Sequence, residues 1–111
     1  MLNQDMTGYS PKNQISIVTD HTDAPLNAFL RLVAEEYSGL EVVESECGYA
    51  CSDHESAVSS GYPASFLFEA AFGEHSPYIH SEKDTVDTVD LEHVLGHVKT
   101  TIGFAVEASD I

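Results

Sequence analysis

The stretch Ser65-Phe-Leu-Phe-Glu69 places three large apolar residues in a row between two polar ones. An apolar run this short and continuous predicts a strand buried on both faces, because a strand with one exposed face would alternate polar and apolar residues. Pro63 stands just before the run, where the strand is expected to begin. The fold is therefore expected to cover this strand from both sides.

Two more strands, with a helix between them, are predicted earlier in the chain. The β-branched segments Ile15-Ser-Ile-Val-Thr19 and Glu41-Val-Val-Glu44 are typical of strands. The helix is predicted to have Asp23 as its N-cap and Pro25 in its first turn, and to end at Ser38-Gly39. Its apolar positions recur at helical spacing: Leu26, Phe29, Leu30 and Val33.

Two further helices and a long loop complete the pattern. Ser52-Asp-His-Glu55 has the form of a capping box, which predicts a short helix that stops at Gly61. From Gly73 to Asp87 the chain is polar, which predicts a loop long enough to be functional or disordered. Asp90 is predicted to cap a final helix. Its apolar stripe is expected to pack on the fold and consists of Leu91, Val94, Leu95, Val98, Ile102, Ala105 and Val106.

Strands and helices thus alternate along the chain. This order predicts an α/β layered fold with helices packed on a sheet. A length of 111 residues suits one domain, 1–111. The segment Met1–Thr7 has neither the basic nor the apolar region of a secretory signal. Because Asp5 and Met6, two candidate site residues, follow almost at once, we expect the sequence to begin inside a larger fold.

The charge balance excludes several classes of partner. Four Lys and Arg stand against 19 Asp and Glu, which gives a net charge of −15. Nucleic acid and acidic membrane surfaces are excluded as partners because both need clustered basic residues. No apolar run approaches the ~20 residues of a membrane span. The acidic surface is typical of a secreted or salt-exposed protein, and cation binding is the alternative interpretation.

The sequence contains two cysteines, Cys47 and Cys51, separated by Gly-Tyr-Ala. A disulfide, a pair of free buried thiols and a metal-binding pair are all open on chemical grounds. A disulfide would need an oxidising compartment. A thiolate metal site would need a second ligand pair at suitable spacing, which the sequence lacks.

The six histidines have different predicted roles. His80 lies in the long loop after the buried strand, where α/β sheets place their sites, and is a candidate ligand. His93 and His97 are four residues apart on the last helix, but the motif of helical metalloproteases is absent, so we predict a surface or packing role. His54 is predicted to be structural. His21 and His75 are predicted to be exposed.

Six short segments occur in an order that resembles a known family. They are Asp5-Met-Thr7, Val18-Thr-Asp20, Cys47-Gly-Tyr-Ala-Cys-Ser-Asp-His54, Gly61-Tyr-Pro-Ala64, Phe68-Glu69, and Ile79-His80 with Asp84-Thr85. Together they resemble the second half of the M28 zinc aminopeptidases, in particular the secreted bacterial leucyl aminopeptidases of the marine Vibrio type. The resemblance runs from about Asp5 to the end of the chain.

The resemblance implies a two-zinc exopeptidase that removes apolar N-terminal residues from peptides, on a mixed sheet covered by helices. It implies that Asp5 is a carboxylate ligand of one zinc, His80 a ligand of the other, and Tyr49 a donor to the tetrahedral intermediate. It also implies a Cys47–Cys51 disulfide and an extracellular or periplasmic parent protein. The implied pocket for the first side chain of the substrate consists of Met6, Val18, Cys47, Tyr49, Cys51, Phe66, Phe68, Phe72 and Ile79.

The remaining zinc ligands and the general base of the family precede the segment that Asp5 matches. Two ligands cannot close a tetrahedral zinc site, so we expect an incomplete and inactive fragment on its own. The alternatives are a non-catalytic remnant that binds a peptide or partner or associates with itself, and one half of a split enzyme. Ser56-Ala-Val58 also departs from the family, which usually has a Trp and a His there.

Overall fold

We describe residues 1–110 of a computed structural model. Four strands form one mixed sheet in the order β1-β4-β2-β3. Their bounds are Leu2–Gln4 for β1, Gln14–Val18 for β2, Glu41–Ser45 for β3 and Ser65–Phe68 for β4. β1 runs parallel to β4, β2 runs parallel to β3, and β2 is antiparallel to β4. The predicted α/β class, with helices on a mixed sheet, is confirmed.

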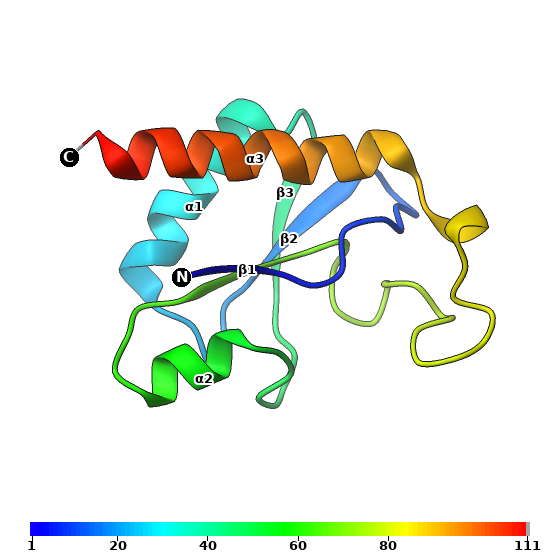
Figure 1. Cartoon of the computed structure of the whole chain (residues 1–111), viewed down its shortest axis with the longest axis horizontal. Coiled ribbons are helices and arrows are strands. Elements are labelled where there is room, and N and C mark those ends of the chain that lie inside the picture. Colours follow the sequence, from blue (N-terminus) through cyan, green and yellow to red (C-terminus); the bar gives the residue numbers. More distant parts are fainter. Residues whose placement is uncertain (111) are drawn as a thin grey trace.

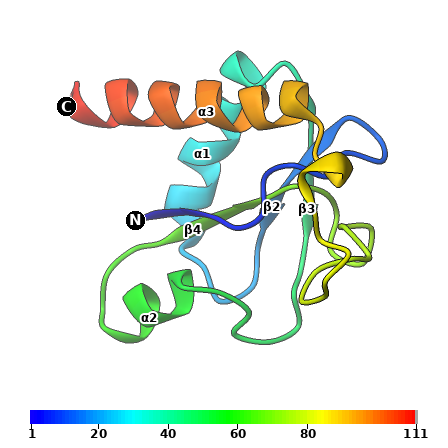
Figure 2. The same ribbon diagram turned by 45° about the vertical axis from the view of Figure 1, so that its right-hand side comes forward.

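Three α-helices and one short 3-10 helix accompany the sheet. They are α1 at Ala24–Tyr37, α2 at His54–Ser59, η1 at Val86–Thr88 and α3 at Leu91–Ser109. α3 runs along the top of Figure 1 and the end of α1 reaches it, while α2 lies below the strands. Phe29 of α1 packs against Phe104 of α3 with 5.4 Å between the ring centroids. Figure 2 shows from a second direction that α3 lies above the strands and α2 below them. The helices therefore occupy both sides of the sheet.

β4 is buried on both faces, as its sequence predicts. Leu67 packs with Ile15, Ile17 and Leu30 in the core that α1 and α3 cover. Phe66 and Phe68 pack with Val18 and Cys47 in a second core on the opposite face. The alternation of side chains along one strand thus separates the molecule into two apolar layers.

The cap of α1 follows the prediction. The Asp23 side chain accepts a hydrogen bond from Leu26 N at 2.9 Å, and Pro25 lies in the first turn. The capping box predicted for α2 is wrong, since Asp53 is the N-cap and its side chain makes no capping hydrogen bond. The Ser52 hydroxyl instead donates to Asp5, as described below.

The last helix forms as predicted, with Asp90 as its N-cap, but the predicted orientation of its stripe is wrong. The buried residues of α3 are His93, Gly96, His97, Thr100 and Gly103. Most of the predicted stripe is exposed, including Leu95, Val98 and Ile102. No helix within residues 1–110 is long and apolar enough to cross a membrane.

Candidate active site

A cavity of about 190 Å³ opens where several strands and loops end. β1 and β4 are parallel, so the residues after both strands meet at one edge of the sheet. The loop after β3 and the long loop after β4 close the remaining sides. The lining residues are Asp5, Met6, Tyr49, Cys51, Phe66, Phe68, Phe72, His75, Ile79 and His80.

All of these lining residues except His75 are among the predicted site residues. Asp5 and His80 line the cavity, so the two predicted metal ligands lie at the same opening. Val18 and Cys47, predicted as pocket residues, lie in the core cluster beneath the lining instead. The prediction of an exposed His75 is wrong, because its ring packs against Phe68 and Phe72 at 5.3 and 4.9 Å. The polar residues that flank His75 in the sequence gave no signal for this contact.

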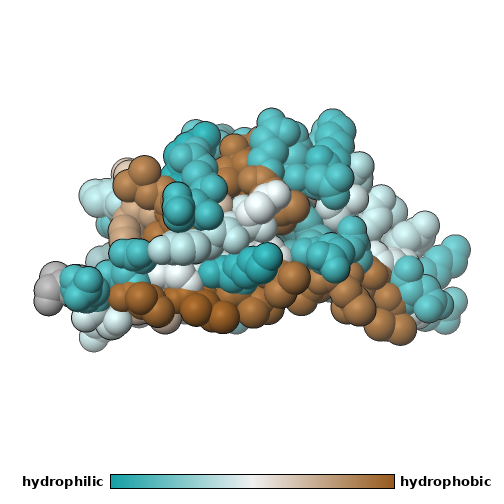
Figure 3. Space-filling view, turned by 90° about the horizontal axis from the view of Figure 1, so that it is seen from above, coloured by the Kyte–Doolittle hydropathy of each residue, from teal (hydrophilic) through white to brown (hydrophobic). Residues whose placement is uncertain are grey.

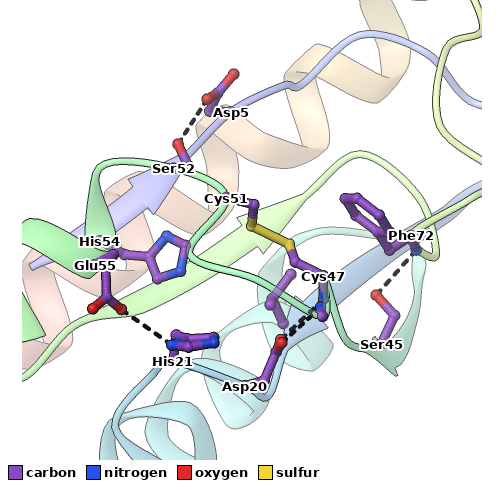
Figure 4. The surroundings of a disulfide bond; sticks show 12 residues. Asp5, Asp20, His21, Ser45, Cys47, Cys51, Ser52, His54, Glu55 and Phe72 are labelled. Carbon is purple, nitrogen blue, oxygen red and sulfur yellow. Dashed lines mark hydrogen bonds and ion pairs between the residues drawn. A yellow bond between two sulfur atoms is a disulfide. The ribbon is translucent and has the colours of Figure 1, made fainter.

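The loop after β3 is held by a disulfide and by a carboxylate. Cys47 and Cys51 form the disulfide, with their Cα atoms 6.3 Å apart. Asp20, which follows β2, accepts hydrogen bonds from Cys47 N at 2.9 Å and Gly48 N at 2.8 Å (Figure 4). Burial alone would raise the pKa of Asp20, but these N–H groups stabilise the carboxylate and hold its pKa below the usual value. The loop that carries Tyr49 is thus anchored at its start.

The apolar wall of the cavity is fixed from below. Phe72 N donates to Ser45 Oγ at 3.1 Å (Figure 4). Ser45 Oγ also lies 2.7 Å from Ser16 Oγ. The Phe72 ring stacks on Phe68 at 5.7 Å and meets the Tyr49 ring edge-on at 6.2 Å. The end of β3 therefore sets the position of the wall.

A chain of polar contacts orients Asp5 at the end of β1. Ser52 Oγ donates to Asp5 Oδ2 at 2.7 Å, and Asn3 Nδ2 donates to Ser52 Oγ at 3.0 Å. Asn3 Nδ2 also lies 3.4 Å from His54 Nδ1, and the buried His54 ring stacks on Phe66 at 4.6 Å. Burial lowers the pKa of His54, which favours the neutral ring. Ser52 therefore orients the candidate ligand Asp5 and does not cap α2.

The long loop that carries His80 is attached to the segment after β1. The Glu69 carboxylate, 2% exposed, accepts hydrogen bonds from Tyr9 N at 3.1 Å and from Ser76 N at 2.8 Å. His80 itself adopts a left-handed backbone conformation with φ of 61°. Because one buried carboxylate joins both segments, the loops bearing Asp5 and His80 are tied to each other.

The donor atoms at the cavity suit zinc, which binds carboxylate oxygen and imidazole nitrogen. Ser52 engages only Oδ2 of Asp5, so the other carboxylate oxygen remains available as a ligand. Within residues 1–110, no group of three or more His, Cys, Asp and Glu side chains could hold a metal ion. Asp5 and His80 therefore fit a zinc site as contributors that need ligands from elsewhere.

Known proteins of similar sequence are peptidases. Residues 1–105 match peptidase family M28. The probable leucine aminopeptidase of Arthroderma benhamiae is 45% identical over 109 residues, which are 96% of this chain and 30% of that protein. A probable leucine aminopeptidase of Arthroderma otae is 47% identical over 107 residues, again 96% of this chain and 29% of that protein.

Solved structures give the same result for the fold. The LapA aminopeptidase of Legionella pneumophila superposes with a TM-score of 0.92 at 37% identity, over 96% of this chain and 30% of that one. LapB of the same organism superposes with a TM-score of 0.90 at 29% identity, over 96% of this chain and 31% of that one. The chain thus spans about 30% of the length of the relatives it matches, and it belongs to peptidase family M28.

Proposed function

We propose that this chain supplies the substrate pocket and part of the metal centre of a zinc aminopeptidase that removes apolar N-terminal residues from peptides. The observation that carries the proposal is the shared cavity: Asp5 and His80 line the same opening as Tyr49 and a group of aromatic side chains. Membership of family M28 supports peptidase chemistry there.

The aromatic walls provide the specificity in this proposal. Phe66, Phe68 and Phe72 line the cavity together with Met6 and Ile79. Burial of a leucine-like side chain in such surroundings stabilises the bound peptide by about 1.5–3 kcal/mol. A charged first residue would lose its hydration without gaining a partner on these walls. The cavity therefore favours peptides that begin with an apolar residue.

Asp5 and His80 would hold the metal ions, and Ser52 would keep the Asp5 carboxylate turned toward the opening. Bound zinc would supply Lewis-acid polarisation of the scissile carbonyl and a water of lowered pKa. The Tyr49 hydroxyl is the donor of this chain to the developing oxyanion, and the disulfide and Asp20 hold its loop in advance of the reaction. Each residue thus has a binding or orienting task.

The general base and the remaining metal ligands would come from polypeptide outside this chain. Two ligands do not close a tetrahedral site, and a carboxylate base is needed to accept the proton of the water. We therefore expect the chain alone to bind no zinc tightly and to hydrolyse no peptide. It would gain activity when the preceding part of an M28 domain is supplied.

Leucine p-nitroanilide hydrolysis tests this function. The chain would be assayed with zinc, alone and joined to the part of the Arthroderma benhamiae protein that precedes its matching segment. We expect no hydrolysis by the chain alone, and hydrolysis by the joined form that falls at least a hundredfold with His80→Ala. The same variant should lower the bound zinc by about one ion, whereas His21→Ala, an exposed histidine outside the cavity, should change neither.

Two outcomes would contradict the proposal. Hydrolysis by the chain alone that His80→Ala abolishes would show that no further ligands are needed. A joined form that binds two zinc ions but hydrolyses no aminoacyl p-nitroanilide, apolar or charged, would exclude aminopeptidase activity.

A further inference from the structure

His75 is a polar side chain in the aromatic wall of the candidate active site. Four of the residues that line the cavity have side chains with hydrogen-bonding groups: Asp5, Tyr49, His75 and His80. The proposed function uses the other three as metal ligands or as the donor to the oxyanion and leaves His75 without a task. Its ring lies against Phe68 and Phe72, with 5.3 and 4.9 Å between the ring centroids. His75 is therefore free to contact the substrate in another way.

One hydrogen bond fixes which ring nitrogen of His75 carries the proton. Gly73 N donates to His75 Nδ1 at 3.0 Å, so Nδ1 is an acceptor and is not protonated. The other nitrogen of an imidazole with one acceptor nitrogen is a donor, which places the proton on Nε2. Within residues 1–110, Nε2 has no hydrogen-bond partner and is not buried. The His75 ring therefore has an N–H group that a ligand can reach.

The backbone holds this N–H group in place from both sides. Gly73, which directly follows Phe72, has a φ of 99°, a conformation that favours glycine. Ser76, on the other side of His75, is 4% exposed, and its N–H donates to the buried Glu69 carboxylate at 2.8 Å. The donor is therefore positioned before any substrate binds, which lowers the entropy lost on binding.

The cavity wall differs in this respect from the open apolar surface of the molecule. In the view from above, a hydrophobic band runs along most of the long axis of the molecule (Figure 3). Such a band attracts other groups roughly in proportion to the apolar area that it buries. An apolar wall that contains a fixed donor is instead typical of a site that selects its ligand by polar groups as well.

From the free N–H group in this wall we propose that His75 extends the pocket for the first side chain to side chains that end in an amide. Peptides that begin with glutamine or asparagine would then be substrates, besides those that begin with an apolar residue. The amide oxygen would accept a hydrogen bond from Nε2 while the carbon atoms lie against Phe68 and Phe72. The inference rests on the proposed function, because it requires that the cavity receives the first side chain.

The charges at the cavity favour an amide over a carboxylate. Within residues 1–110, no Lys or Arg lines the cavity, and Asp5 does. The whole chain carries a net charge of −15, which repels a further negative charge. A neutral amide can accept the same hydrogen bond without this repulsion. The proposed class is therefore the uncharged amides and not the acidic residues.

Matched pairs of substrates test the role of His75. Leucine and asparagine have side chains of the same branched shape, and methionine and glutamine have side chains of similar length. The four p-nitroanilides would be assayed with the chain joined to the preceding part of the Arthroderma benhamiae protein, and the ratio of kcat/KM for the amide to that for its apolar counterpart would be taken. His75→Phe keeps an aromatic ring and removes the donor. We expect it to lower this ratio at least tenfold in one pair, since only an amide of suitable length reaches Nε2.

Two further variants separate the donor from the packing of the ring. His75→Gln places an amide N–H near the position of Nε2, whereas His75→Asn places a carbonyl oxygen near the position of Nδ1, where it can accept from Gly73 N. Both variants lose the ring, so the first should keep the ratio within about threefold and the second should lose it as His75→Phe does. His21→Phe, at an exposed histidine outside the cavity, is the control and should leave the ratio unchanged.

Nitrogen NMR of the imidazole rings in the chain alone provides a measurement that does not depend on hydrolysis. We expect a proton on Nε2 of His75 and none on Nδ1, and the opposite tautomer would overturn the proposal. Ratios that His75→Phe leaves unchanged in both pairs would overturn it too, while hydrolysis of the leucine substrate would retain the proposed function. A joined form that binds two zinc ions and hydrolyses none of the four substrates would reject the proposed function, and this inference with it.

Discussion

The two sides of the sheet differ in how their side chains are held and in how much apolar surface they expose. On the side of the disulfide loop, buried or half-buried polar groups each hold a loop: Asp20 binds the loop after β3, Ser45 binds Phe72, and Glu69 binds the long loop. On the side of α3, the helix is anchored inward while its Leu, Val and Ile residues face outward. The difference teaches that the walls of the cavity are fixed by contacts within this chain, whereas the outward-facing residues of α3 contribute little to its core.

Removal of one aromatic ring from the cavity side should have the largest effect. Phe66 is 1% exposed and stacks on His54, so Phe66→Ala should lower the free energy of unfolding by about 3–5 kcal/mol. Ile102→Ala, on the exposed side of α3, should change it by less than about 0.5 kcal/mol. Urea denaturation of both variants would check the contrast. Equal losses at the two positions would contradict the exposure of Ile102.

Acid should weaken the inner side of α3. Burial, with the neighbouring His93 as a smaller cause, lowers the pKa of His97 to about 3. The unfolded chain binds this proton near pH 6.5 and the folded chain does not, so stability falls as the pH drops below 6.5. Between pH 7 and 4.5 the loss from this residue should be about 2.5 kcal/mol. His97→Gln should flatten the pH dependence measured by urea denaturation, and an unchanged slope would contradict it.

Loss of the disulfide should have a smaller effect on stability. For a loop as short as Cys47–Cys51, chain entropy predicts a stabilisation of about 2 kcal/mol. The variant Cys47→Ser/Cys51→Ser should lose that amount in urea denaturation, and its Gly48 amide should exchange hydrogen faster. α3 gives the comparison, since hydrogen exchange of its backbone amides should stay the same. Faster exchange in both regions would show that the two sides of the sheet are coupled.

The Asp20 carboxylate should contribute least. Asp20→Asn removes the charge from two hydrogen bonds to Cys47 N and Gly48 N, which should cost about 1 kcal/mol. The folded-state pKa of Asp20 is depressed, so its contribution is present above the unfolded value of about 3.9 and is lost as the pH falls through the lower folded value. Wild type and variant should therefore converge in stability once the pH falls below the lowered folded-state pKa of Asp20. A constant difference down to pH 2 would argue against the charge as the cause.

Local signals account for the parts of the fold that the sequence predicts well. Asp23 and Pro25 mark the start of α1, and the apolar run of β4 indicates burial on both faces, because each signal depends on neighbouring residues alone. β1 has only three residues, too few to show a period of two. It becomes a strand because β4, more than 60 residues later, offers it a partner.

The sequence predicts the candidate site only as far as local patterns and the family resemblance reach. The family resemblance brings Asp5, Tyr49 and His80 together, and all three line one cavity. The packing of His75 against Phe72 and the hydrogen bond from Ser52 to Asp5 depend on tertiary contacts that spacing does not encode. For α3, periodicity identifies an apolar face but not what lies against it. Two glycines on the opposite face, Gly96 and Gly103, were the signal for close packing there.

The short edge strand β1 has a consequence for the lifetime of the site. A three-residue strand with one neighbour opens locally at a lower free energy than the whole fold, and Asp5 follows it directly. The frequency with which Asp5 leaves the cavity is therefore set by fraying of the sheet edge rather than by global unfolding. A strand paired along the free side of β1 would suppress this fraying and keep Asp5 at the cavity for a larger fraction of the time.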